Sequence, residues 1–202
     1  MGSIAAAIRP RERPAGILTD AGLIAGGSLA VAALAQVSIH LRFVPITGQT
    51  LGVLLVAASL GMWRGGAAIA LYLAEGAAGL PFYAEARGGL DYLVLRDPLH
   101  VSGGYLWGFL LAAVVVGFLA DRGWMRRFGS AVGAMFLGNV AIYLVGLPWL
   151  AAAIGTSVED ALPFGLHPFV IGDTIKLLLA AALLPAASRM VGSDRARPSD
   201  AA

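Results

Sequence analysis

The chain has 202 residues, of which 58% are hydrophobic and only 13% are charged, and its formal net charge is +2. A soluble domain of this length carries about 25% charged residues, so this composition predicts an all-α protein whose exterior faces a lipid bilayer. No basic run with interleaved aromatic residues occurs, which argues against nucleic-acid binding. The absence of cysteine excludes disulfides and cysteine metal sites.

A short basic segment precedes the first apolar stretch. We expect residues 1–17, which contain arginines and prolines, to lie in the cytoplasm, with the apolar stretch 18–41 following. A signal peptide has an apolar region of only about 7–15 residues, and this stretch is longer, with no clear cleavage site after it. The sequence therefore predicts a retained first transmembrane helix.

Six apolar stretches are candidate transmembrane helices. The first, fourth, fifth and sixth have the roughly 20 residues that a helix needs to cross the hydrocarbon. The second and third are shorter, and a Trp-Arg-Gly-Gly sequence separates them, so they could instead form one kinked span or a re-entrant hairpin. The six candidates are residues 18–40, 50–62, 66–80, 103–121, 130–152 and 168–190.

The arginines favour six spans with both termini in the cytoplasm. This topology places ten arginines on the cytoplasmic side and three outside, in agreement with the positive-inside rule. Merging the second and third spans would move the arginines at 122, 126 and 127 outside. A re-entrant hairpin enters and leaves the membrane on the same side, so it would leave these arginines in the cytoplasm. We therefore expect a six-helix domain over residues 18–191 and a disordered cytoplasmic tail over 192–202.

The connections on the outer side are longer than those on the cytoplasmic side. They cover residues 40–50, residues 80–102 and a third segment around Glu159, Asp160 and Pro163. Loops longer than about 12–15 residues are uncommon and tend to form lids or binding loops. A ligand pocket that opens to the outer face, under these loops, is the predicted arrangement.

Asp173 and Lys176 lie within the last apolar stretch, and Lys176 is the only lysine in the chain. An ionisable residue at membrane depth costs roughly 2.5–3.5 kcal/mol on insertion scales and is interpreted first as a functional site. A spacing of three puts both side chains on one helix face, and Asp173 is expected roughly 8 Å below the outer end of its helix. The pair could form the polar floor of the pocket or be a structural ion pair.

Three further polar residues are candidates for the site: Gln49 in the first outer connection, and Glu75 and Asn139, which are expected to be buried in the third and fifth spans. Gln49 could face the ligand or cap the second span, and Asn139 could bond across helices. Histidines occur at the outer ends of unrelated segments, which is not a metal-site pattern, so no metal ligands are predicted. No P-loop and no catalytic motif is present, so enzymatic activity is not expected.

Small residues recur at a spacing of four in the first span, as Ala21 and Ala25 and as the series Gly22, Gly26 and Ala30. Such faces let helices approach closely. They could pack against a neighbouring helix of this chain or dock a partner protein.

Four ordered motifs resemble the BioY family, the biotin-binding S components of energy-coupling-factor (ECF) transporters. The P-I-T-G-Q-T-L sequence at 45–51 is similar to the stretch after the first span of the family. The G-L-P-F-Y sequence at 79–83 with the following Gly-Gly resembles its third loop, and S-G-G-Y-L-W-G-F at 102–109 resembles the start of its fourth helix. D-T-I-K at 173–176 matches its D-x-x-K in the sixth helix.

The resemblance implies a six-helix subunit that binds biotin for uptake and lies in the cytoplasmic (inner) membrane of a bacterial cell. The subunit would act with a transmembrane coupling protein and ATPases that use ATP, would carry no cofactor of its own, and would dock through Ala21 and Ala25. Asp173 would accept from the ureido N–H groups of biotin and Lys176 would donate to its carbonyl, although Lys176 could instead meet the carboxylate. The remaining implied ligand contacts are Gln49, Phe82, Tyr83, Arg87, Gly89, Tyr143, Asn139 and Glu75.

Alternatives remain open at this level. The same subunit class could take another vitamin or small ligand. A metal ion is less favoured, because cobalt and nickel subunits begin with Met-His and this chain begins with Met-Gly. A membrane enzyme or a purely structural bundle would be a different class of protein, and no acid, base or nucleophile for an enzyme is evident.

Overall fold

The computed structural model describes residues 13–94 and 101–193. The expected cytoplasmic tail falls almost wholly outside these residues, as do the first 12 residues of the expected N-terminal segment. The helices are α2 (Arg13–Ala35), α3 (Gln49–Ala77), α4 (Gly103–Asp121), α5 (Phe128–Ile154), α6 (Val158–Gly165) and α7 (Val170–Ser193). The shorter elements are β1 (Ser38–Ile39), β2 (Ile46–Thr47) and the 3₁₀ turns η1 (Ala84–Ala86), η2 (Leu90–Leu93) and η3 (Trp124–Arg126).

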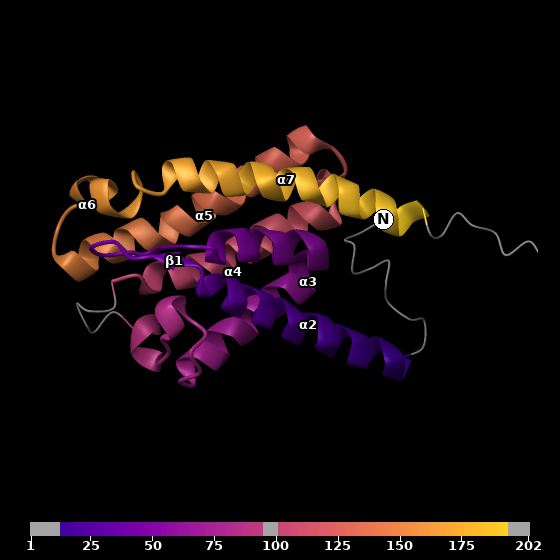
Figure 1. Ribbon diagram of the computed structural model, residues 1–202, viewed down its shortest axis with the longest axis horizontal. Coiled ribbons are helices and arrows are strands. Elements are labelled where there is room, and N and C mark those ends of the chain that lie inside the picture. Colours follow the sequence, from indigo (N-terminus) through magenta and orange to yellow (C-terminus); the bar gives the residue numbers. More distant parts are fainter. Residues whose placement is uncertain (1–12, 95–100, 194–202) are drawn as a thin grey trace, which may run out of the picture.

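The long helices form a bundle whose three longer connections, residues 36–48, 78–102 and 155–169, gather at one end (Figure 1). Helix α3 packs mainly against α2 and α4, and α4 packs against α5. In Figure 1 the β1–β2 hairpin, α6 and the magenta turns η1 and η2 lie towards the left, and helix α2 begins at the opposite end. We call the end that carries β1, β2, η1, η2 and α6 the loop end of the bundle.

Helix α3 is a helical hairpin rather than one straight rod. Gly61 interrupts it with φ 81° and ψ −178°, a conformation that only glycine adopts readily. Gln49 Nε2 lies 2.6 Å from the hydroxyl oxygen of Tyr72 although 23 residues separate them. In a straight helix these residues would be roughly 35 Å apart, so the two arms of α3 fold back on each other. The sequence predicted a break slightly later, at residues 63–66.

The arms of α3 are held together by close backbone contact. A Cβ atom added at Gly65 would lie only 2.9 Å from Ala57 Cα on the other arm. Small residues therefore permit the approach, as in the tight helix pairs of membrane proteins. The arms have rises of roughly 18 Å and 24 Å, which is shorter than the roughly 30 Å hydrocarbon core of a bilayer.

The described residues contain four helices long and apolar enough to cross a membrane, or five if the pair α6 and α7, bent by 65°, counts as one span. The all-α membrane fold expected from composition is thus confirmed, and the number of spans is supported only as four to five. The exposed faces agree with a lipid environment, because large apolar side chains such as Leu144 and Ile171 are 67% and 76% exposed.

Two connections hold structure that the sequence did not predict. The first span was expected to reach residue 40, but α2 ends at Ala35, and the chain then forms the antiparallel β1–β2 pair. The third outer connection was expected to be a loop, but it contains α6. Ser157 Oγ caps this helix by accepting from the Asp160 N–H at 3.1 Å, and it donates to the Asp160 carboxylate at 2.7 Å. This reciprocal cap stabilises a helix start.

Candidate ligand-binding site

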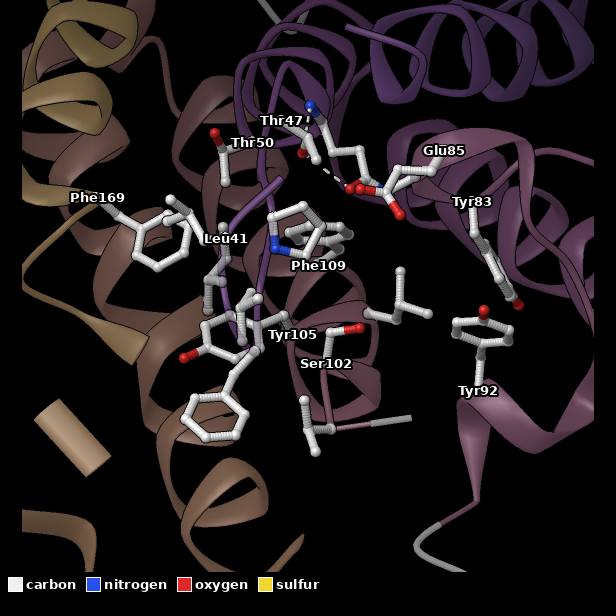
Figure 2. A pocket seen from close by; sticks show the side chains of 18 of the residues that line it. Leu41, Thr47, Thr50, Tyr83, Glu85, Tyr92, Ser102, Tyr105, Phe109 and Phe169 are labelled. Carbon is white, nitrogen blue, oxygen red and sulfur yellow. Dashed lines mark hydrogen bonds between the residues drawn. The ribbon is translucent and has the colours of Figure 1, made fainter. Parts of the chain in front are cut away.

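A cavity of about 330 Å³ lies at the loop end of the bundle. The first connection, the 80–94 region and helices α3, α4, α5 and α7 supply its wall, and Figure 2 shows their side chains converging on it. Its size falls at the lower end of the roughly 300–1,000 Å³ range of small-molecule sites. Six of the ten predicted ligand contacts line it, namely Gln49, Tyr83, Arg87, Tyr143, Asp173 and Lys176.

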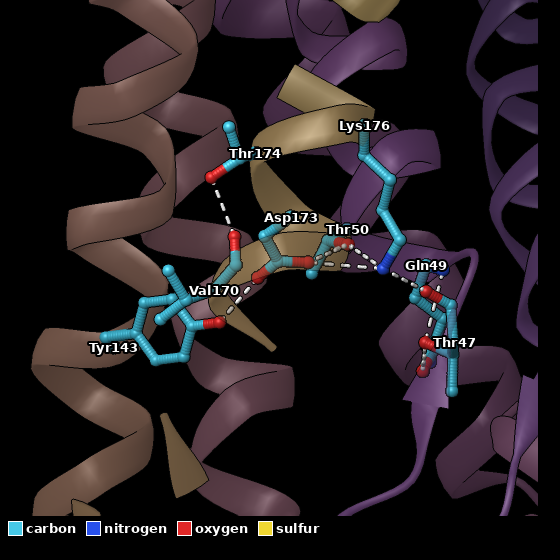
Figure 3. A network of polar contacts seen from close by, with 8 residues as sticks. All are labelled: Thr47, Gln49, Thr50, Tyr143, Val170, Asp173, Thr174 and Lys176. Atoms are coloured by element: carbon cyan, nitrogen blue, oxygen red, sulfur yellow. Dashed lines mark hydrogen bonds and ion pairs between the residues drawn. The ribbon is translucent and has the colours of Figure 1, made fainter. Parts of the chain in front are cut away.

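Asp173 and Lys176 both reach this cavity from consecutive turns of α7 (Figure 3). Lys176 Nζ lies 3.1 Å from Asp173 Oδ1, and the Asp173 residue is only 4% exposed. The i,i+3 spacing gives this contact, as expected from the sequence. Both charged groups border the cavity, so a polar ligand in it can contact them directly.

The ammonium group of Lys176 already has three acceptors within the protein. They are the Thr47 carbonyl oxygen at 2.7 Å, Thr50 Oγ1 at 3.1 Å and Asp173 Oδ1 at 3.1 Å. An ammonium group has three N–H donors, so its hydrogen-bonding capacity is matched. A ligand oxygen that binds Lys176 must therefore share or replace one of these contacts.

The carboxylate of Asp173 is less fully engaged. Its Oδ1 accepts from Lys176 and from Thr50 Oγ1 at 3.2 Å, and its Oδ2 accepts from the hydroxyl of Tyr143. A carboxylate offers about four acceptor positions, so about one is left for a ligand donor. The geometry thus favours an N–H or O–H group of the ligand at Asp173.

Thr47 and Gln49 secure the start of α3 beside this pair. Thr47 Oγ1 accepts from the Gln49 backbone N–H at 3.2 Å and donates to Gln49 Oε1 at 2.8 Å. The Gln49 amide in turn donates to Tyr72, which joins the two arms of α3. Thr47, rather than the Gln49 side chain, therefore supplies an acceptor for the first N–H of α3, and Gln49 lies in the cavity wall.

Aromatic rings form much of the remaining wall. Tyr83 is 1% exposed, and its ring makes an edge contact with Tyr72 at a centroid distance of 5.8 Å. The Tyr92 ring is 5.5 Å from the Tyr83 ring between centroids, and Figure 2 shows the two rings next to each other. Tyr105 and Tyr143 are perpendicular at 6.2 Å. Burial raises the pKa of Tyr83 to about 12, so the phenol stays neutral and donates to the Leu73 carbonyl at 2.7 Å.

Charged groups meet at the more exposed rim of the cavity. Arg87 lies 2.7 Å from Glu85 and is half exposed, and Glu85 also contacts His40 Nδ1 from the first connection. The hydrogen bond with Tyr92 and the charge of Glu85 raise the pKa of Arg87 above its ordinary value. The rim therefore carries a cation, with its charge partly balanced by Glu85.

Four predicted contacts lie outside the cavity wall. Phe82 packs against the core, and the Gly89 N–H donates to the Gly76 carbonyl at 2.8 Å. Glu75 accepts from Ser28 and so joins α3 to α2. Asn139 is buried on α5, where it borders a separate apolar hollow between α5 and α7.

Sequence reasoning did not assign several wall residues. Thr50 bridges Asp173 and Lys176 although it is an ordinary helix residue by sequence, and Tyr105 and Glu85 also line the cavity. The only signal for Thr50 and Tyr105 was their position within the quoted motifs. Among the described residues, no group of three or more His, Asp or Glu side chains could hold a metal ion.

Comparison with known proteins identifies the family. The BioY family model matches residues 9–193. "Biotin transporter BioY" of Thermotoga maritima is 40% identical over 147 residues, covering 73% of this chain and 82% of the relative. The protein of the same name from Rhodobacter capsulatus is 38% identical over 149 residues, covering 67% of this chain and 74% of the relative.

A solved structure shares the fold. It is described as the S-component for biotin from an ECF-type ABC transporter, and it matches with a TM-score of 0.72 at 23% identity. The match covers 85% of this chain and 92% of the solved chain. The family model spans nearly all of the described residues, and the cavity lies among the motifs that carry the resemblance, so this chain belongs to the BioY family.

Proposed function

We propose that this chain is the biotin-binding membrane subunit of a biotin uptake system. The observation that carries the proposal is the pair of Asp173 and Lys176 in the wall of a cavity large enough for a vitamin. The family relatives named as biotin transporters support the choice of ligand. The protein is a transport subunit rather than an enzyme.

The chemistry of biotin suits this pair. The ureido ring has two N–H donors and one carbonyl acceptor, and Asp173 has about one acceptor position left beside the ammonium group of Lys176. Hydrogen bonds to charged partners are about twice as strong as neutral ones in a dry site. In this orientation the valeryl chain runs past the aromatic wall and its carboxylate meets Arg87 at the rim.

The opposite orientation would place the carboxylate on Lys176. The ammonium group already has three acceptors in the protein, which favours the ureido orientation. Titration of tryptophan fluorescence with biotin, and with its methyl ester, separates the two. The ester keeps the ureido ring and loses the negative charge. In the ureido orientation its affinity should therefore be only moderately lower than that of biotin, whereas in the opposite orientation it should be much lower.

A second experiment tests ligand identity. Thermal-shift measurements with biotin, other vitamins and divalent cations should give the largest stabilisation with biotin. A larger shift with another vitamin would identify that vitamin as the ligand instead of biotin, and the assignment of the chain to the BioY family would stand. No shift with any compound would contradict the transport proposal itself.

We further propose that each arm of α3 forms its own membrane pass, giving six helices with both termini in the cytoplasm and the loop end outside. The contact of Gln49 with Tyr72 supports antiparallel arms. The chain contains no native cysteine, so single cysteines can be labelled without background. Cysteines at Ile39 and at Trp124 should react with a membrane-impermeant maleimide from opposite sides.

Helix α2 is the proposed docking surface for a transmembrane coupling protein that works with ATPase subunits. Only 22% of the residues in its most apolar stretch are buried, compared with 50–61% in the corresponding stretches of α3, α4 and α5. Ala21 is exposed and Ala25 is half-buried, and Cβ atoms added at Gly22 and Gly26 would meet nothing within 4 Å. This small-residue face lets a partner helix approach closely within the bacterial inner membrane.

A further inference from the structure

One exposed side chain holds a wall of the cavity in place. Gln36 follows the last residue of α2, and its amide reaches the segment formed by residues 80–87. Gln36 Nε2 donates to the Ala32 carbonyl of α2 at 3.0 Å and lies 3.3 Å from both the Pro81 and the Tyr83 carbonyl oxygens, and Gln36 Oε1 accepts from the Ala86 N–H at 2.8 Å. A single amide thus bonds the segment at both of its ends, which fixes its position relative to α2.

The bonded segment contributes directly to the cavity. Tyr83, Glu85 and Arg87 line the cavity, and Figure 2 shows Tyr83 and Glu85 beside it. The Tyr83 N–H donates to the Arg87 carbonyl at 2.9 Å, so the segment closes on itself as a compact turn. Any displacement of this turn therefore moves an aromatic wall residue and the charged rim together.

The turn has a conformation that it would not keep by itself. Glu85 and Ala86 have φ values of 61° and 55°, in the left-handed region that side chains other than glycine rarely adopt. Such conformations persist where surrounding contacts hold them, and they concentrate at functional sites. The bond from the Ala86 N–H to Gln36 is a contact of this kind, because it is made by the residue that has the unfavourable backbone.

We infer that Gln36 is a positioning residue that keeps the 80–87 segment closed on the cavity and so slows the escape of bound ligand. The ligand is taken from the proposed function, so the inference deepens that function. Gln36 does not line the cavity, and its effect is exerted through Tyr83, Glu85 and Arg87. Gln36 directly follows α2, so a shift of that helix would be transmitted to the cavity wall through this side chain.

Dissociation kinetics of biotin from the full chain in nanodiscs test the inference. Gln36→Met keeps the length of the side chain and removes its hydrogen bonds, and it should increase the biotin dissociation rate about three- to tenfold. Val37→Ala is the matched control, since Val37 is the next residue and its side chain is 66% exposed. This control should leave the rate unchanged. An unchanged rate in Gln36→Met would overturn the inference.

A rescue experiment distinguishes positioning from general damage. Ala86 is one of the two left-handed residues of the turn, and glycine adopts this backbone without penalty, so Ala86→Gly lowers the tendency of the turn to relax. In the Ala86→Gly background, Gln36→Met should accelerate dissociation less than in the wild type. An equal acceleration in both backgrounds would show that Gln36 does not act through this turn.

Hydrogen exchange without ligand separates this inference from the proposed function. Gln36→Met should speed amide exchange in residues 80–87 and leave α4 and α5 as protected as in the wild type. Should biotin fail to bind the wild type, the proposed function falls, and the exchange result still decides whether Gln36 holds the segment. Gln36→Asn, whose amide is one methylene too short, should behave as Gln36→Met does. Unchanged exchange in both variants would contradict the inference.

Discussion

Lys176 Nζ and Asp173 Oδ1 lie 3.1 Å apart, one turn along α7, and the hydroxyl of Thr50 contacts both groups. These contacts join α7 to α3, and the pair also borders the cavity. Both charges belong to one helix, and their shared partner comes from α3, at the wall of a cavity. The pair therefore orders a surface that a ligand can reach.

Removing either charge should weaken biotin binding strongly. Asp173→Asn keeps the shape and loses the charge, which leaves the half-buried Lys176 ammonium group without its counter-charge. The charge-assisted hydrogen bond to the ligand is lost with it, and hydrogen bonds to charged groups contribute about 1.5–3 kcal/mol. We expect at least a tenfold loss of affinity for Asp173→Asn and for Lys176→Met, measured by tryptophan fluorescence. Wild-type affinity in both variants would remove the pair from the site.

Thr50→Val should lower the affinity for biotin about tenfold. The valine has nearly the same shape but lacks the hydroxyl that donates to Asp173 and accepts from Lys176. Hydrogen bonds to charged groups contribute about 1.5–3 kcal/mol. Thr50→Ser keeps the hydroxyl and is the matched control, with affinity close to that of the wild type. Equal losses in the two variants would assign the effect to packing.

Gly61→Ala should destabilise the chain by about 1–3 kcal/mol or more. The conformation at Gly61 is one that a Cβ atom makes unfavourable, and the bend between the two arms of α3 depends on it. Gly129→Ala is the control, because a Cβ atom there meets nothing within 4 Å. Thermal unfolding in detergent measures both. A midpoint for Gly61→Ala at or above that of the control would contradict the hairpin.

The buried phenol of Tyr83 should make stability fall at high pH. Its pKa is raised by burial from 10.0 to about 12, so the folded chain holds a proton that the unfolded chain loses. The resulting stabilisation is complete below pH 10 and disappears as the pH rises through 12. The advantage of the wild type over Tyr83→Phe in midpoint temperature should therefore shrink between pH 9 and pH 11.5. A constant difference would show that Tyr83 titrates normally.

A bulky residue on the exposed face of α2 should block docking without affecting the ligand site. Ala21→Leu adds three carbon atoms where a partner helix is proposed to approach, whereas biotin affinity should not change. Ala182→Leu on α7 is the control, since Ala182 is also exposed. Co-purification with the coupling protein should be lost only in Ala21→Leu. Loss in neither variant would place the docking surface elsewhere.

Much of the fold could be predicted because long apolar stretches have few alternatives in a membrane. The fourth candidate span, 103–121, coincides with α4, and the fifth and sixth differ from α5 and α7 by a few residues. The bend in α3 was placed near residues 63–66, where a charge and two glycines suggest a break. The actual bend is at Gly61, which has a φ of 81°, and α4 approaches closely there: a Cβ atom added at Gly117 would lie 2.6 Å from Met62 Cα. Such a contact between distant segments is not visible in the sequence.

The site was predictable in part for a similar reason. A charge in an apolar stretch is conspicuous, so Asp173 and Lys176 were found. Thr50, by contrast, contributes only a hydroxyl, and its role depends on a contact with residues more than a hundred positions away. Gln36 was not identified either, because its bonds are to backbone atoms of a segment whose path the sequence does not specify.

The lone lysine makes the cavity chemically unique within this chain. Apart from a chain terminus, Lys176 Nζ is the sole primary amine available. An amine-selective isotopic reagent would therefore modify one internal position, and the extent of modification would measure how many cavities are occupied.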